Sequence, residues 1–395
     1  MVRIVAWPLA LFTAAALAAS SDDLGSVLQR QHNLTTFYDL IKICAPSDKA
    51  FENIPYTSLN DVWDPSDVAK TTALLQYHIL QGSVTIADLE SGPTYLERTL
   101  LTASAYTNVT AGQNVLIDKQ PGDTIVLTSS LGTRCTVIEQ DIAFSGGRIH
   151  VIDNLLIPPA PLRATAATFR AQSFLAALYA AGLMPDVDDR RNVTVFAPRD
   201  AAMDLVGGSL EAALQGRGGK AALARVMGYH VVPGRILSST DLVNGTVLTT
   251  LSGGSNATSG SGSGNARLVV RQAGNDKFVN SAKIVQPDIL LANGIMHLVA
   301  DVLNPDAPSA TPDPTLASQP PVFPVSVASS PFASALPCTS DCPTSTSAAT
   351  ASSTTTTTAS SGGGKPTSSK NGGVPKPTAH AAAAALGVLG AGLLL

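Results

Sequence analysis

Two stretches of the chain share one pattern. Residues 44–51 read Cys-Ala-Pro-Ser-Asp-Lys-Ala-Phe, and residues 196–203, which lie 152 positions further on, read Phe-Ala-Pro-Arg-Asp-Ala-Ala-Met. The same spacing, without a gap, brings the block Tyr-His-Ile-Leu-Gln-Gly at 77–82 onto Tyr-His-Val-Val-Pro-Gly at 229–234. Two matching blocks at one spacing indicate an internal repeat.

A third block extends the repeat. Residues 141–150 run from Asp-Ile to Gly-Arg-Ile-His, and residues 288–297 run from Asp-Ile to Gly-Ile-Met-His, now 147 positions apart. The chain therefore contains two copies of one domain, predicted at 24–159 and 164–306 with a proline-rich connection between them.

Each copy reads as a mixture of helices and strands. Residues 173–183 are strong helix formers with an apolar face, and the β-branched run at 193–196 predicts a strand. Asp48 and Asp200 each come shortly after a proline, where a carboxylate favours the start of a helix. Further short strands with Gly or Asn turns are expected at 124–128, 267–271 and 284–285.

The three blocks, in this order and spacing, resemble the fasciclin (FAS1) domain, twice over. The resemblance covers nearly all of the foldable chain. It implies a β-rich α+β fold, in which each domain is a wedge of two small β-sheets packed with helices. It also implies cell adhesion or matrix and wall organisation, without catalysis. Cys44 replaces the usual strand Phe, and Gly132-Thr133-Arg134 replaces the Asn-x-Ala that the second copy keeps at 280–282, so we expect the first domain to differ at that strand.

The regions outside the two copies resemble processing and spacer segments. Arg3 precedes an apolar stretch that closes on small residues, which predicts a secretory signal peptide at 1–19. Of the 26 residues at 344–369, 17 are Ser or Thr, and such a segment buries too little apolar surface to fold. We therefore expect an O-glycosylated, disordered stalk at 307–371.

The C-terminus follows the order of a GPI-attachment signal. Small residues are followed by a short polar spacer and an apolar tail at 379–395. This order predicts Asn371 as the acceptor, with Ser369 as an alternative, and 372–395 as the propeptide. A weakly hydrophobic tail-anchor helix is the other interpretation, although a membrane span needs about 20 apolar residues.

Five N-glycosylation sequons precede the stalk, in settings that suit surface loops. They begin at Asn33, Asn108, Asn192, Asn244 and Asn256.

The repeated Tyr-His pairs are the strongest candidates for a site. Their match to the family implies a link to integrin adhesion, whereas their apolar neighbours favour a buried, structural role. On the structural interpretation, each His would hydrogen-bond the Asp, or in the first copy the Ser, of the first block. The residues concerned are Tyr77, His78, Ser47 and Asp48 in the first copy, and Tyr229, His230 and Asp200 in the second.

Catalytic, metal and nucleic-acid functions find little support. The chain is net acidic, with 25 basic and 29 acidic residues and no Lys/Arg cluster in its sequence, so it is a poor candidate for binding phosphate backbones. No Gly-x-Ser-x-Gly elbow is present. His150 and His297, like the His of each Tyr-His pair, have no helical i,i+4 His or nearby Cys to complete a metal site. We expect a protein without cofactor whose repeated histidines are structural.

The four cysteines suit a secreted chain. Cys44 and Cys135 correspond to Phe196 and Ala282 of the second copy, positions that we expect to be neighbours across a sheet. This predicts a Cys44–Cys135 disulfide, with two buried thiols as the alternative. Cys338 and Cys342 lie in the stalk and are expected to close a small loop or to bridge to another molecule.

A signal peptide, two such domains, a stalk and a GPI tail together resemble a fungal cell-surface fasciclin-like protein. We expect a glycoprotein on the outer leaflet that adheres to, or organises, a wall or matrix by binding a surface protein or polysaccharide. The competing interpretation is a carbohydrate- or lipid-binding module without adhesive function.

Overall fold

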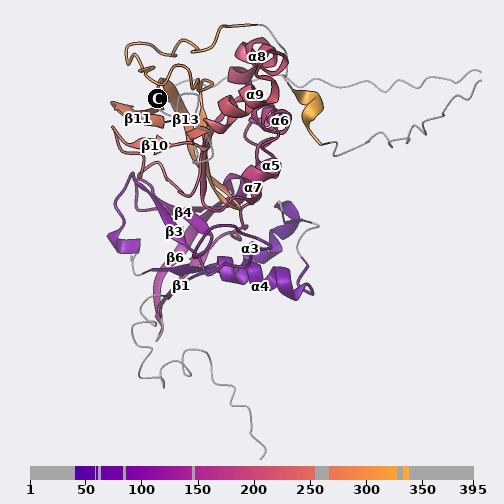
Figure 1. Cartoon of the computed structure of the whole chain (residues 1–395). Helices are drawn as coiled ribbons and strands as arrows, with labels where there is room; N and C mark the ends of the chain where they lie inside the picture. The colour runs from indigo at the N-terminus through magenta and orange to yellow at the C-terminus, as the bar shows by residue number, and fades with distance from the viewer. Residues whose placement is uncertain are drawn as a thin grey trace, which may run out of the picture. The chain divides into compact units, whose positions relative to one another are not determined.

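The computed structural model describes residues 41–57, 59–60, 64–82, 86–144, 147–253, 267–326 and 332–337. They lie within one compact unit, Met1–Cys338. We call the first repeat domain 1 (residues 41–159) and the second domain 2 (residues 164–306); Figure 1 colours them from indigo to magenta and from magenta to orange. The described residues exclude the predicted signal peptide, Asn33, Asn256, Cys338, Cys342, Asn371 and the GPI signal.

In its described residues, domain 1 forms a seven-stranded sheet in the order β2-β1-β7-β6-β5-β4-β3. The strands are β1 (Ile41–Pro46), β2 (Ile79–Gln81), β3 (Thr94–Arg98), β4 (Asn114–Lys119), β5 (Ile125–Thr128), β6 (Arg134–Phe144) and β7 (Gly147–Ile152). The helices are α3 (Asp48–Glu52) and α4 (Val68–Tyr77), with 3-10 turns η1 (Ile54–Tyr56), η2 (Ile86–Asp88) and η3 (Ser130–Gly132).

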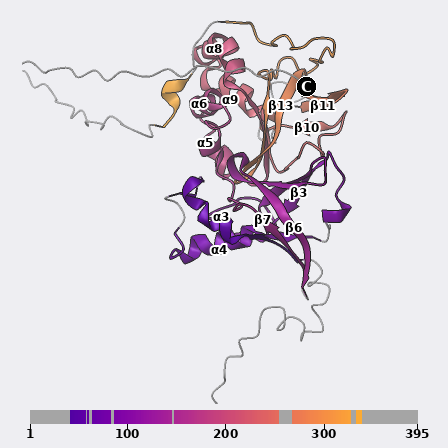
Figure 2. The same cartoon turned by 180° about the vertical axis from the view of Figure 1, so that it is seen from behind.

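The part of domain 2 that the structure describes repeats this sheet, in the order β9-β8-β14-β13-β12-β11-β10. Its strands are β8 (Val193–Pro198), β9 (Val231–Val232), β10 (Val247–Thr249), β11 (Arg267–Ala273), β12 (Asp276–Val279), β13 (Ala282–Leu291) and β14 (Gly294–Val299). Its helices are α5 (Leu162–Thr165), α6 (Gln172–Ala181), α7 (Asp186–Asp189), α8 (Asp200–Gln215) and α9 (Gly219–Gly228), with a 3-10 turn η4 (Leu251–Gly253). The two views in Figures 1 and 2 show α6, α8 and α9 along one side of this sheet.

The repeated blocks meet on neighbouring strands toward one end of each sheet. The strand of the first block pairs in parallel with the strand of the third, so that Cys44 lies opposite His150 and Phe196 opposite His297. The α+β fold predicted from the blocks is confirmed. The two small sheets expected in each domain are parts of one continuous sheet, because the long strands β6 and β13 each pair along both edges.

Several predicted elements are present where the residue pattern placed them. The helix expected at 173–183 is α6, which ends at Gly182 in the left-handed conformation that glycine adopts without strain. Asp48 and Asp200 begin α3 and α8. Domain 1 differs from domain 2 before β6, as expected: it has η3, with Leu131 and Gly132 at positive φ, where domain 2 turns on Asn280 alone.

The predicted start of the stalk at 307 is too early. Described residues beyond it pack on domain 2: Phe332 is buried in its core, and Phe323 and Leu336 contact the same cluster. Ser326 donates its backbone N–H to Leu205 O at 2.8 Å. The Pro- and Ser-rich composition concealed this segment because a few aromatic anchors are enough to hold an extended chain against a surface.

Candidate functional site

The Tyr-His pair of domain 1 is buried and joins α4, β4 and the segment after β7. Tyr77 and His78 are 0% and 3% exposed. The Tyr77 hydroxyl donates to Asn114 O on β4 at 2.7 Å. Nδ1 of His78 donates to Leu74 O on α4 at 2.8 Å, and Nε2 accepts the N–H of Leu156, after β7, at 2.9 Å.

Domain 2 repeats this arrangement. His230 Nδ1 donates to Val226 O at 2.9 Å and Nε2 accepts the N–H of Leu303 at 2.9 Å, while the Tyr229 hydroxyl donates to Arg267 O at 2.7 Å. One nitrogen donates and the other accepts, so each imidazole is neutral. Burial lowers the pKa of both His78 and His230 to about 4.

The prediction of the hydrogen-bond partners of His78 and His230 was wrong, although both side chains are buried as expected. Both imidazoles bond to backbone groups rather than to Ser47, Asp48 or Asp200. Ser47 instead caps α3 by accepting the Ala50 N–H at 3.3 Å, and Asp200 accepts the Ser173 N–H at 2.8 Å.

The histidines of the third block hold a bulge. Asp141 and Asp288 have φ of 59° and 60°, at register shifts in β6 and β13. This turns their N–H groups onto Nδ1 of His150 and His297, at 3.1 and 3.2 Å. His297 Nε2 also donates to Leu237 O at 2.8 Å, and burial lowers the pKa of its imidazole. Like the histidines of the Tyr-His pairs, His150 and His297 are buried and bonded within their own domain.

Cys44 and Cys135 are both thiols in this structure rather than the predicted disulfide. They are buried in one hydrophobic cluster, and burial raises the pKa of the Cys135 thiol. They are not on neighbouring strands, because β7 lies between β1 and β6. Phe196 fills the position of Cys44 in domain 2, where its ring stacks on His297 at 5.4 Å between centroids.

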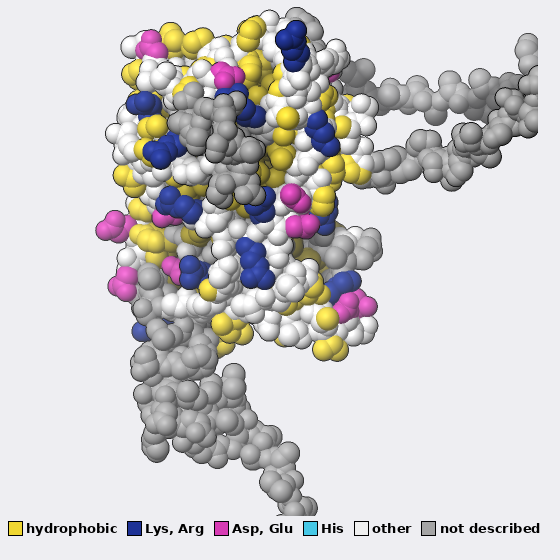
Figure 3. Space-filling model, viewed as in Figure 1, with side chains coloured by type: hydrophobic (Ala, Val, Ile, Leu, Met, Phe, Trp, Pro, Cys, Tyr) yellow, Lys and Arg dark blue, Asp and Glu magenta, His cyan; other side chains and the backbone are white. Residues whose placement is uncertain are grey.

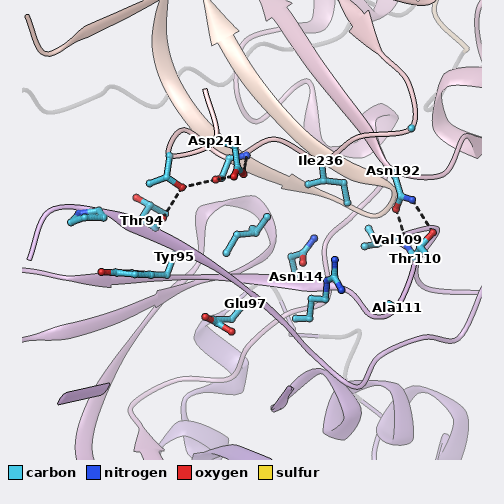
Figure 4. Close-up of a pocket in the computed structure, with 16 residues that line it drawn as sticks. Thr94, Tyr95, Glu97, Val109, Thr110, Ala111, Asn114, Asn192, Ile236 and Asp241 are labelled. Atoms are coloured by element: carbon cyan, nitrogen blue, oxygen red, sulfur yellow. Dashed lines mark hydrogen bonds between the residues drawn. The ribbon is translucent and has the colours of Figure 1, made fainter. Parts of the chain in front are cut away.

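A groove of about 820 Å³ lies between the two domains (Figure 4). Thr94 and Asn114, from β3 and β4, lie on the domain 1 side, and Ile236 and Asp241 lie on the domain 2 side. Because side chains alternate along β3, Leu96 and Arg98 share the face of Thr94, whereas Tyr95 packs against the domain 1 core. The lining combines hydroxyl and amide side chains with a few aliphatic ones and with the charged groups of Glu97, Arg98 and Asp241; its other hydroxyl and amide residues are Tyr95, Thr110, Asn192, Ser238 and Thr240.

The groove is held by a hydrogen-bonded contact between the domains. Gln113 is 0% exposed, and its Nε2 lies 3.2 and 3.1 Å from the carbonyl oxygens of Leu291 and Ala292, in the β13–β14 hairpin. Ala292 O also accepts the Asn108 N–H at 2.8 Å. The connection between the domains is fixed as well, because the buried Asp188 carboxylate binds Arg163 at 2.9 Å. No repeat pattern marked Gln113, since the contact joins unlike parts of the two copies.

A family model for the fasciclin domain matches residues 10–158 and 169–305. The chain belongs to the fasciclin domain family. The two FAS1 matches cover the two domains that the structure describes, the first of them beginning before the described residues. The repeated blocks supply buried residues that hold each FAS1 core together.

Two curated fungal relatives are similar to this chain over about three quarters of its length. A fasciclin-like arabinogalactan protein of Arthroderma benhamiae is 26% identical over 75% of this chain and 64% of its own length. The fasciclin-like arabinogalactan protein elcF of Phaeosphaeria nodorum is 29% identical over 73% of this chain and 90% of its own. Among solved structures, a FAS1 domain pair from the insect cell adhesion molecule Fasciclin I is 16% identical, covering 67% of this chain and 89% of that one with a TM-score of 0.29.

The described surface of the FAS1 pair has no concentrated charge on the face in Figure 3, where Lys and Arg side chains are dispersed and no histidine is visible. Within the described residues, no group of three His, Cys, Asp or Glu side chains is placed to hold a metal ion. Likewise, none of the helices described is long and apolar enough to cross a membrane.

Proposed function

We propose that this FAS1 protein is a non-enzymatic glycoprotein of the cell surface that adheres to, or organises, a wall or matrix. The family and the fungal arabinogalactan-type relatives support this role. The chain is displayed on a GPI lipid attached at Asn371, above an O-glycosylated stalk, after removal of the signal peptide.

The observation that carries the proposal is the groove between the domains. Its volume of about 820 Å³ accommodates a segment of a polymer, and both domains line it. Hydroxyl and amide side chains donate and accept hydrogen bonds, which matches the hydroxyl groups of a polysaccharide. Sites for apolar ligands are lined mainly by hydrophobic and aromatic side chains, so a wall saccharide fits this groove better than a lipid.

Groove variants test the proposal on the purified ectodomain. Arg98→Ala and Thr240→Val change two lining side chains, whereas Arg134→Ala and Thr249→Val change exposed residues of the same types outside the groove. We expect the groove variants to weaken retention on wall polysaccharide by about tenfold, the loss of one or two hydrogen bonds. The control variants should bind like the wild type.

Binding is measured on a glycan array and by sedimentation with isolated wall polysaccharide, with folding checked by thermal melting. Saccharide binding that the groove variants leave intact would place the site elsewhere. If the wild type aggregates cells but binds no saccharide, the partner is a surface protein and the saccharide assignment is wrong.

A further inference from the structure

Two of the N-glycosylation sequons contact each other across the domain interface. Asn108-Val109-Thr110 belongs to domain 1, and Asn192-Val193-Thr194 belongs to domain 2. The backbone N–H of Thr110 donates to Oδ1 of Asn192 at 2.8 Å, and Nδ2 of Asn192 donates to Oγ1 of Thr110 at 2.8 Å. Figure 4 shows both bonds as dashed lines at one end of the groove.

The orientation of the Asn192 amide follows from its partners. A backbone N–H only donates, so the atom facing it is the oxygen. Oδ1 and Nδ2 both bond to Thr110, so the amide turns toward Thr110 the edge that carries both atoms. The N–H on that edge is the one cis to Oδ1. A substituent on a trans amide occupies that cis position, as the next Cα does in a trans peptide. A sugar on Nδ2 would therefore stand where Thr110 Oγ1 now lies.

The attachment is covalent. In N-glycosylation the anomeric carbon of a lipid-pyrophosphate-linked oligosaccharide bonds to Nδ2, the bond to the pyrophosphate oxygen breaks, the pyrophosphate leaves and Nδ2 loses one proton. A glycan on Asn192 therefore stays on this amide, and the two bonds to Thr110 cannot form around it. If the Asn192–Thr110 contact opens, two nearby contacts of the same interface would have to separate with it. They join Asn108 N–H to Ala292 O and Gln113 to the β13–β14 hairpin.

Asn244 provides a contrast within domain 2. It is exposed, and its Oδ1 accepts the N–H of Gln272 from its own domain at 3.1 Å. Asn244 makes none of the interface bonds described above, so a glycan there leaves those bonds intact.

We propose that a glycan on Asn192 and the closed FAS1 pair exclude each other, so that occupancy of this sequon decides whether the two domains are locked together. A chain without a sugar at Asn192 has a rigid pair with a formed groove. A chain that carries one has two domains joined only by their connection.

The test uses the full ectodomain secreted from a glycosylating eukaryotic host. Glycopeptide mass spectrometry measures occupancy at Asn192, with Asn244 as the internal control, and hydrogen exchange of the separated glycoforms follows the amides of Thr110 and Asn108. In molecules with Asn192 unmodified, we expect both amides to be protected. In molecules with a sugar at Asn192, both should exchange about tenfold faster or more, because opening the interface exposes them.

Two variants separate the sugar from the side chain. Asn192→Asp keeps an oxygen acceptor for the Thr110 N–H but takes no glycan, and should be as protected as unmodified wild type. Asn244→Asp should change neither amide. The proposal is overturned by a sugar-bearing Asn192 with both amides protected, or by an unmodified Asn192 with both exposed. A secreted product with Asn244 occupied, Asn192 empty and both amides protected supports it.

Discussion

Acid should destabilise both FAS1 domains through His78 and His230. Burial lowers the pKa of each imidazole to about 4, from about 6.5 in an unfolded chain. Above pH 6.5 both states are neutral and stability is unaffected. As the pH falls from 6.5 to 4, each imidazole binds a proton in the unfolded chain but stays neutral in the folded domain, so the free energy of unfolding decreases. The full shift corresponds to about 3 kcal/mol for each His, and about 2 kcal/mol is already lost at pH 5.

Urea unfolding between pH 4 and pH 8 measures this loss. Because carboxylates also titrate at the acidic end, the decisive quantity is the difference between the wild type and His230→Gln, whose amide does not titrate. The variant is expected to be less stable at pH 8 but to lose less stability on acidification, in domain 2 only. Parallel pH profiles for the two proteins would show that His230 is not held neutral by burial, and the reasoning would fail.

Three further predictions concern the Tyr-His pair, the cysteines and the GPI signal. His78→Ala leaves the Leu156 N–H without its acceptor, which costs about 1–3 kcal/mol, so domain 1 should melt several degrees lower and adhesion should track the folded fraction. Tyr56→Ala, at an 88% exposed position, is the control. Unchanged melting with lost adhesion would make the pair a binding site. Cys44 and Cys135 should resist alkylation until the domain is unfolded, whereas a Cys44–Cys135 peptide in a non-reducing map would restore the predicted disulfide. Deleting residues 379–395 should release the protein into the medium, and phospholipase should release the intact form; membrane retention after both treatments would refute the GPI proposal.

The fold was predictable because its most constrained residues occur twice. A buried Tyr-His pair, a parallel strand pairing and a bulge held by His each need particular side chains at fixed spacing, so both copies keep them. The bonding partners of His78 were not predictable, because Leu74 O and the Leu156 N–H are backbone groups that any residue supplies. A local sequence pattern favours nearby carboxylates and cannot show a backbone group brought close by the fold.

The site was less predictable than the fold for a related reason. Gln113 and the β13–β14 hairpin meet only once in the chain, and so do the sequons of Asn108 and Asn192. A contact between domain 1 and domain 2 uses a different surface of each copy, so the repeat gives no signal there.

This separation bears on where recognition resides. The histidines that the two copies share are buried, and His78 and His230 are bonded to backbone groups of their own domain. Groups that line the groove, such as Arg98 and Thr240, come from positions where the copies differ, and the groove exists only while the interface is closed. Duplication therefore supplied two stable cores, and divergence at their junction supplied a surface that neither domain has alone. If that is correct, each domain expressed separately should fold but lose saccharide binding, and mixing the two should not restore it at micromolar concentration. Full binding by either domain alone would show that recognition does not depend on the junction.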